Sequence, residues 1–270
     1  FERLALSLPF NYIRRHGDSL FQVEALLFGQ AGLLEEEPLD GEERETGRPE
    51  DGKTRKTEVT PEMQKKRESE NREDDYFLQL QKEYRFLKNK YSLEPLEGYL
   101  FKRMRVRPHS FPAMRIAQLA ALLQSSERLF SKVLEREKID DWTSLFCVSP
   151  SVYWRTHYSF GNRSPESSGQ LGQASRQILL INTVAPMLFA YGRKTATESY
   201  CDKAIRLLES LKPERNAVVS EFREAGLLAY NAFDTQAIIQ LRRGYCDPKK
   251  CLFCRIGHSI LSRKGKNSKD

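Results

Sequence analysis

The chain has 270 residues, of which 39% are hydrophobic and 30% charged. This length suffices for one large domain or two small ones, and the balance is that of a polar but globular protein rather than a disordered chain. The longest apolar runs, such as 178–183, are too short to span a bilayer, so we expect no membrane partner. Three of the five cysteines crowd into 246–254, unlike the evenly paired framework of a small secreted domain, so we expect a reducing compartment, the cytoplasm.

The formal net charge of +7 is unevenly spread along the chain. Residues 35–74 hold 15 acidic and 9 basic side chains, whereas residues 241–270 hold 9 basic and 2 acidic ones. A basic body with a basic tail is the charge distribution expected of a nucleic-acid-binding protein. An ordinary basic surface has the same composition, so charge alone does not decide between these two readings.

The first part of the chain predicts a helix followed by a disordered insertion. The chain opens at Phe1 in what reads as a helix already under way, so we expect a C-terminal fragment of a longer protein. Asp18 or Ser19 can cap a helix that ends near Gly29. Residues 35–59 are rich in Glu, Gly, Arg and Thr and have almost no large apolar residue, so this stretch is predicted to be disordered.

The rest of the chain predicts helix after helix. Pro61 starts a polar helix that becomes amphipathic near Tyr76. A strongly apolar helix follows Pro112, another begins near Ser126, and a short aromatic helix follows Pro150. Further helices are predicted at 174–191, 196–211, 214–228 and 231–243. Because no period-2 run and no internal repeat is found, we predict an all-α, multi-helix array.

This pattern divides the chain into five segments. We predict a helical N-terminal part at 1–34, a disordered charged insertion at 35–74, a helical core domain at 75–243, a Cys/Cys/Cys/His knuckle at 244–262 and a basic tail at 263–270.

A candidate metal site lies near the C-terminus. Cys246, Cys251, Cys254 and His258 are spaced C-x4-C-x2-C-x3-H. Two thiolates at x2 spacing form the usual knuckle, and residues 254 and 258 would share one face of a helix. Four N and S ligands so close together suit tetrahedral zinc, and four protein ligands would make the site structural rather than catalytic.

Two other readings of the cysteines stay open. C-x4-C-x2-C is also the spacing of plant-type iron–sulfur sites, which need a distant fourth ligand that Cys201 could supply. The third reading has no metal, only reduced thiols packed in a short C-terminal hairpin.

A basic stretch precedes the apolar helix and is a candidate nucleic-acid-binding site. Lys102, Arg103, Arg105 and Arg107 lie within LFKRMRVRP, and Arg115 follows near the start of the helix. In an extended chain the three arginines of this stretch would share one face. Arginine forks and the first helical N–H groups together could hold phosphate. A solvated basic loop, or pairing with acidic helices, would explain the same residues.

No catalytic constellation is found in the chain, so an enzymatic role is left undecided. There is no Gly-rich phosphate loop, no G-x-S-x-G elbow and no paired-carboxylate motif.

Several long stretches carry a family pattern in a fixed order: SLPFNYIRRHGDSLFQVEALLFGQAGLL, QLQKEYRFLKNKY, RVRPHSFPAMRIAQLAALL, INTVAPMLFAYG, NAFDTQAIIQL and GYCDPKKCLFCRIGH. In these stretches the chain resembles the uncharacterised family known as domain of unknown function 2851, and the resemblance includes Cys246, Cys251 and Cys254. The family has no established activity. The resemblance implies an additional N-terminal region, similar to restriction-endonuclease-like folds, as the missing partner domain of this chain.

Two functions compete on this basis. The first is a helical, nucleic-acid-contacting module with a structural metal site, forming the C-terminal part of a larger nuclease-like protein. The second is a protein-interaction or scaffold module without nucleic-acid binding.

Overall fold

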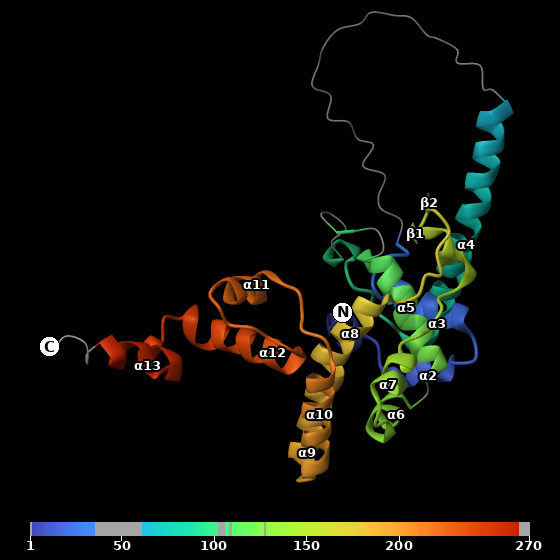
Figure 1. The fold of residues 1–270 in the computed structure, drawn as a ribbon. Helices are drawn as coiled ribbons and strands as arrows, with labels where there is room; N and C mark the ends of the chain where they lie inside the picture. The colour runs from blue at the N-terminus through green and yellow to red at the C-terminus, as the bar shows by residue number, and fades with distance from the viewer. Residues whose placement is uncertain (1, 36–60, 102–105, 108–109, 127, 265–270) are drawn as a thin grey trace, which may run out of the picture. The chain divides into compact units, whose positions relative to one another are not determined.

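The computed structural model describes residues 2–35, 61–101, 106–107, 110–126 and 128–264, with backbone only at 61–74 and 263–264. The chain divides into two compact units (Figure 1). The first unit comprises residues 1–129 and 145–171, and the second comprises residues 130–144 and 172–270.

These units do not coincide with the predicted segments, because 75–243 is shared between them. Of the predicted insertion at 35–74, residues 36–60 lie outside the described part, whereas 61–74 belong to a helix.

Helices dominate both units, which confirms the all-α class. The first unit contains α1 (Glu2–Ser7), α2 (Phe10–Arg15), α3 (Leu20–Gln30), α4 (Pro61–Tyr91), a 3-10 turn (Gly98–Leu100), α5 (Pro112–Ser125), a second 3-10 turn (Val152–Arg155), β1 (His157–Ser159) and β2 (Asn162–Arg163). At the unit boundary, α6 (Leu129–Glu135) and α7 (Ile139–Leu145) follow one another. The second unit continues with α8 (Gln173–Leu179), a π-helical turn (Leu180–Val184), α9 (Ala185–Thr195), α10 (Glu198–Ser210), α11 (Ala217–Glu224), α12 (Ala232–Leu241), a π-helical turn (Arg242–Cys246), a 3-10 turn (Cys251–Phe253) and α13 (Arg255–Lys264).

Helix α3 is the centre of the first unit and lies against α4 and α5 (Figure 1). The hydroxyl oxygen of Ser19 accepts a hydrogen bond from the backbone N–H of Gln22 at 3.3 Å, which confirms one of the two predicted caps. A Cβ at Gly29 would lie 2.0 Å from the ring of Tyr84 on α4. Only glycine therefore allows the two helices to approach this closely.

The first unit also contains a two-stranded antiparallel hairpin that the sequence did not predict. β1 pairs with β2 through His157 and Arg163. The predicted aromatic helix after Pro150 is only a 3-10 turn, and Tyr158 lies in β1. The prediction of a helix through this segment was therefore wrong. The hairpin escaped notice because strands of three and two residues are too short to show a period-2 pattern.

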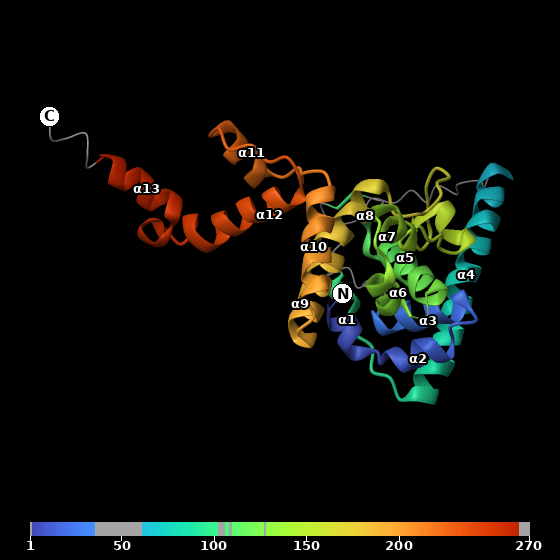
Figure 2. The ribbon, with the colours of Figure 1, turned by 60° about the horizontal axis from the view of Figure 1, so that its bottom comes forward.

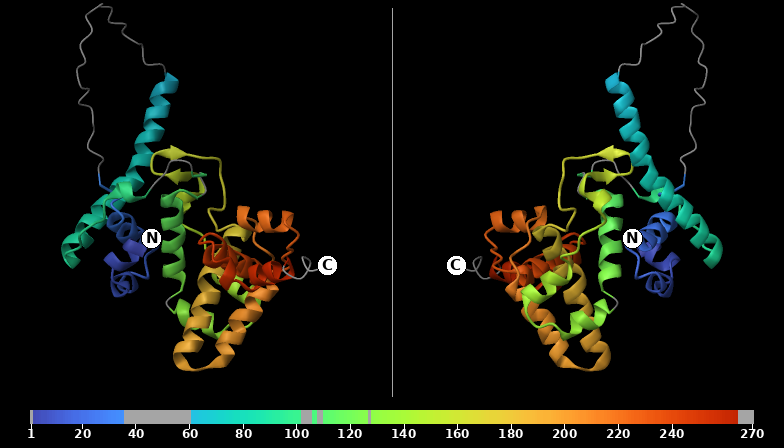
Figure 3. Two further views of the ribbon diagram at one scale, coloured as in Figure 1. Left: turned by 90° about the vertical axis from the view of Figure 1, so that its left-hand side faces the viewer. Right: turned by 90° about the vertical axis from the view of Figure 1, so that its right-hand side faces the viewer.

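In the second unit, α9 and α10 form an antiparallel pair joined by a short loop (Figures 2 and 3). A Cβ at Gly192 would lie 2.8 Å from the sulfur of Cys201, so glycine sets the close approach of these helices. Pro186 stands in the first turn of α9, directly after the π-helical turn at Leu180–Val184. The wider turn accommodates a residue that has no backbone N–H to donate.

The last helices of the second unit lead into the cysteine segment. The side-chain oxygen of Asn231 accepts a hydrogen bond from the backbone N–H of Asp234 at 2.9 Å and caps α12. A π-helical turn then carries the chain to Cys246. Within the described residues, no helix combines the length and the apolar character needed to cross a bilayer.

Candidate functional site

Three cysteines of the second unit surround one pocket of about 440 Å³, here called the cysteine pocket. Cys246, Cys251 and Cys254 all line it. The rest of its wall is mainly apolar and includes Phe222, Leu227, Leu241, Tyr245, Ile256 and Ile260. The structure thus places all three cysteines around one pocket, and their role as metal ligands stays a prediction.

The backbone of residues 242–256, here called the cysteine turn, is shaped to bring the cysteines together. The N–H of Asp247 donates to the carbonyl of Arg242 at 2.9 Å, which continues the wide helical turn. The N–H of Lys250 donates to the carbonyl of Tyr245 at 2.8 Å, closing the loop. Lys249 adopts a left-handed conformation with φ of 55°, which costs free energy for a residue with a side chain.

A close backbone approach fixes the start of α13 against the same turn. A Cβ at Gly257 would lie 2.5 Å from the carbonyl oxygen of Cys251, so any other residue would push the helix away. The carbonyl of Cys254 accepts from the N–H of His258 at 2.8 Å, as the first hydrogen bond of the helix. Cys254 thus stands at the junction of the turn and α13, and it is the one buried thiol of the three.

The residues fit a metal in chemistry but not in their present geometry. Three thiols are soft ligands of the kind that bind zinc. Yet in the parts of the chain that the structure describes, no group of three or more Cys, His, Asp or Glu side chains is arranged to hold a metal ion. His258 is exposed and does not line the cysteine pocket, and its Nδ1 lies 3.5 Å from the hydroxyl of Ser262.

The remaining cysteines stand apart from the pocket. All five cysteines lie within the described residues, and none forms a disulfide. Cys201 does not line the cysteine pocket, and its thiol donates to the carbonyl of Phe189 at 3.6 Å. The structure therefore does not bring the proposed fourth ligand of an iron–sulfur cluster to the other three.

The cysteine turn also presents basic and aromatic side chains to solvent. Tyr245 is 38% and Phe253 82% exposed. The side chains of Arg243, Lys249, Lys250 and Arg255 are exposed along the same turn. Arg242 differs from them, because its guanidinium pairs with Glu221 at 2.8 Å and Asp247 at 2.6 Å and so ties the turn to α11.

The net charge of the protein belongs entirely to the second unit. That unit contains 20 basic and 13 acidic residues, a net charge of +7, whereas the first unit contains 24 of each. A positive potential around a folded unit attracts polyanions and speeds their association.

The predicted basic stretch is only partly described. Lys102, Arg103 and Arg105 lie outside the described residues, and Arg107 is exposed. Arg115 is half-buried on α5, where its guanidinium donates to Gln118 at 3.0 Å and to Ser110 at 3.3 Å. Burial lowers the pKa of Arg115. The Gln118 amide in turn donates to the carbonyl of Gly169 at 2.8 Å, so Arg115 supports a loop contact, and its binding to phosphate stays a prediction.

One buried polar cluster escaped the sequence reasoning. Glu24 on α3 is 0% exposed in the core of the first unit. The hydroxyl of Tyr76 donates to its Oε2, and the hydroxyl of Ser151 donates to the same oxygen at 3.2 Å. Among the described residues, Glu24 Oε1 and Trp154 Nε1 are buried without a hydrogen-bond partner of good geometry.

The environment of Glu24 favours its neutral form. Burial raises the pKa of Glu24, and nearby donors on Tyr76, Trp154 and Ser151 oppose this shift only in part. The ring of Tyr76 stacks on Tyr153 with centroids 4.5 Å apart, and Tyr153 stacks on His157 at 4.0 Å. A carboxyl within the otherwise apolar stretch VEALLF was the only sequence signal for this cluster.

These features define a helical protein of two compact units, with a cysteine pocket in the second. The chain belongs to the family described as "Protein of unknown function (DUF2851)", whose family model matches residues 1–217. The match stops before Cys246, so it does not include the cysteine turn. No curated protein and no solved structure matches the chain.

Proposed function

We propose that the second unit contacts nucleic acid through the cysteine turn. The observation that supports this proposal is the meeting of exposed aromatic and basic side chains on one turn. Tyr245 and Phe253 alternate there with Arg243, Lys249, Lys250 and Arg255.

Single-stranded nucleic acid is the form that this chemistry suits best. Aromatic faces stack on unpaired bases, while lysine and arginine side chains neutralise the phosphates between them. Phe253 is 82% exposed beside Leu252 at 73%, and contiguous exposed apolar surface marks interaction sites. In a longer protein, the unit would position the strand for a nuclease-like region. A reducing compartment such as the cytoplasm suits the thiols.

A structural metal forms the second part of the proposal. Zinc would be held by Cys246, Cys251 and Cys254, with His258 from the first turn of α13 as the fourth ligand after the turn rearranges. The metal would supply a rigid link between the turn and α13, and with it a fixed spacing of Tyr245 and Phe253. An iron–sulfur cluster that also uses Cys201 is the alternative, and it would require Cys201 to leave its bond to Phe189.

Fluorescence anisotropy with a labelled single-stranded oligonucleotide tests the nucleic-acid contact. Binding should weaken steeply as salt rises, and Lys249→Glu with Lys250→Glu should weaken it at least tenfold, on the order of two lost phosphate contacts. The matched control is Arg193→Glu with Lys194→Glu, which makes the same charge change at exposed positions on α9. An equal loss of affinity in both variants would show that only the net charge of the protein matters, not the cysteine turn. No binding at low salt would refute the proposal.

A protein-interaction module is the second candidate. It is favoured by the exposed apolar side chains of the same region, because Leu252 is 73% and Ile260 56% exposed. Light scattering after size exclusion should then show a defined oligomer that Leu252→Asp with Ile260→Asp converts to a monomer. A monomer at all concentrations would count against this second candidate.

A further inference from the structure

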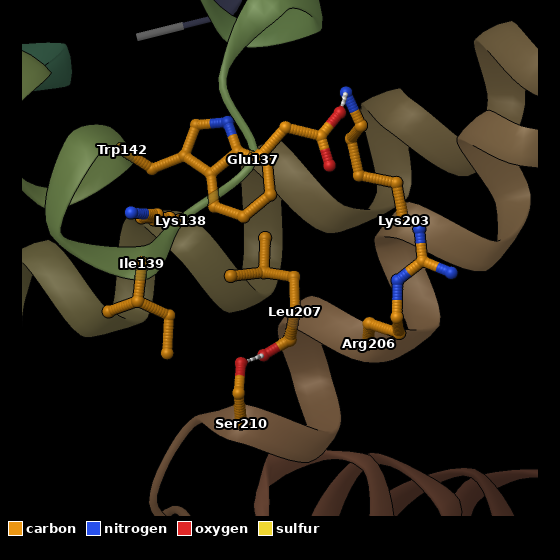
Figure 4. A pocket seen from close by; sticks show the side chains of 8 residues that line it. All are labelled: Glu137, Lys138, Ile139, Trp142, Lys203, Arg206, Leu207 and Ser210. Atoms are coloured by element: carbon orange, nitrogen blue, oxygen red, sulfur yellow. Dashed lines mark hydrogen bonds and ion pairs between the residues drawn. The ribbon is translucent and has the colours of Figure 1, made fainter.

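A second pocket of the same unit, here called the basic pocket, has a volume of about 340 Å³ (Figure 4). It lies between the first turn of α7, together with the two residues before it, and one face of α10. The first of these contributes Glu137, Lys138, Ile139 and Trp142, and α10 contributes Lys203, Arg206, Leu207 and Ser210.

A buried lysine anchors one side of the basic pocket. Lys203 is only 8% exposed, and its ammonium donates to the carbonyl of Leu134 at 2.8 Å. The ammonium also pairs with the carboxylate of Glu137 at 2.8 Å (Figure 4). The hydrogen bond from Lys203 lowers the pKa of Glu137. Glu137 therefore stays ionised at neutral pH and offsets the charge of Lys203.

The charge that is left over points to a dianion. After Lys203 and Glu137 cancel, Lys138 and Arg206 leave the basic pocket with a net charge of +2. Both side chains are exposed, with Arg206 beside Lys203 and Lys138 across the pocket near Ile139 and Trp142 (Figure 4). A phosphate monoester carries a charge close to −2 at neutral pH, and the guanidinium fork matches two of its oxygens. We propose that the basic pocket binds a phosphate monoester.

The opposite wall suits the organic part of such a ligand. Figure 4 shows Ile139 and Trp142 on one side, Lys203 and Arg206 on the other, and Leu207 between them. Apolar walls that face a few charged groups are typical of small-molecule sites, and the volume is at the lower end of their range. A nucleoside monophosphate should therefore bind more tightly than inorganic phosphate, which has nothing to place against the apolar wall.

Two sources could supply this chemistry: a free mononucleotide, or the terminal phosphate of a nucleic-acid strand. Only the second source rests on the proposed function. The basic pocket and the cysteine turn use different residues, so their contributions can be separated by substitution.

Isothermal titration of the full chain with adenosine monophosphate tests the proposal, with adenosine and inorganic phosphate as comparison ligands. Arg206→Ala should weaken binding of the monophosphate about tenfold or more, because it removes a charge-assisted pair. Arg193→Ala, an exposed arginine outside the basic pocket, should leave the affinity unchanged. Glu137→Gln should instead strengthen binding of the monophosphate, because it removes the carboxylate that pairs with the Lys203 ammonium.

Equal affinity for adenosine and adenosine monophosphate, or an unchanged affinity in Arg206→Ala, would overturn the proposal. Oligonucleotides with and without a terminal phosphate then separate the sources. If the ligand is the end of a strand, the phosphorylated oligonucleotide should bind more tightly than the unphosphorylated one. If the ligand is a free mononucleotide, the two oligonucleotides should bind equally. The proposed function is tested separately. It fails if the unphosphorylated strand does not bind, or if the Lys249→Glu, Lys250→Glu variant binds that strand as tightly as the natural protein.

Discussion

Tyr76 on α4 donates its hydroxyl hydrogen to the buried carboxyl of Glu24 on α3. This bond joins α3 and α4 in the first unit, where Glu24 is 0% exposed. The Ser151 hydroxyl lies 2.9 Å from the same Tyr76 oxygen, so the cluster also ties in the segment before β1.

The raised pKa of Glu24 predicts that the first unit loses stability as pH rises. The folded state binds the proton more tightly than the unfolded chain, whose carboxyl has a pKa near 4.5. The contribution is thus fully present below that value and is lost as pH rises through the folded pKa. Urea midpoints followed by circular dichroism between acidic and neutral pH should fall for the natural protein and stay flatter for Glu24→Gln. Parallel slopes for both proteins would contradict this prediction.

Removing the phenol hydroxyl should weaken the same cluster. In Tyr76→Phe, Glu24 keeps only Ser151 as a well-aligned donor, so we expect a loss of about 1–3 kcal/mol in the free energy of unfolding. The control is Tyr158→Phe on β1, a half-buried tyrosine outside the cluster. Equal unfolding midpoints for the natural protein and Tyr76→Phe would show that the hydroxyl bond contributes nothing.

The close approach of α3 and α4 predicts a strong effect of one added methyl group. Gly29→Ala places a Cβ inside the ring of Tyr84, so the helices must separate, at a cost of about 3 kcal/mol. Gly17→Ala, whose Cβ would make an ordinary contact at 3.4 Å, is the matched control. Thermal unfolding should show the loss in the first variant only; a Gly29→Ala protein as stable as the natural one would mean that Tyr84 simply moves aside.

The cysteine turn predicts zinc binding that depends on its thiols. Protein purified under reducing conditions and titrated with zinc should take up about one ion per chain by elemental analysis. Cys251→Ser should abolish this uptake, and Cys147→Ser should not, since Cys147 lies in the other unit. Iron with a visible chromophore would favour the cluster instead, and a metal-free, fully folded protein would leave only packed thiols.

The close approach of Gly257 to Cys251 keeps α13 packed against the cysteine turn. Gly257→Ala adds a Cβ 2.5 Å from the Cys251 carbonyl oxygen and should move α13 away. The thiol of Cys254, buried at this junction, should then react faster with an alkylating reagent. An unchanged alkylation rate would show that the turn yields without exposing the thiol.

Local patterns predicted most of the helices and the cap at Ser19, because such a cap depends on a residue only three positions away. The spacing of Cys246, Cys251 and Cys254 is local in the same sense, and the structure places all three around one pocket. The burial of Glu24 was not predicted, since it arises from Tyr76 and Ser151, which are distant along the chain. The metal and the nucleic-acid contact stay predictions.

The two tryptophans of the chain fall one to each unit. Trp154 is 0% exposed against Phe28, and Trp142 is 2% exposed with its indole N–H donating to the carbonyl of Val133 at 3.0 Å. Each unit therefore carries its own intrinsic fluorophore. Replacing either one by phenylalanine leaves a single emission that reports one unit at a time, so the order in which the two units melt can be read from an unlabelled chain.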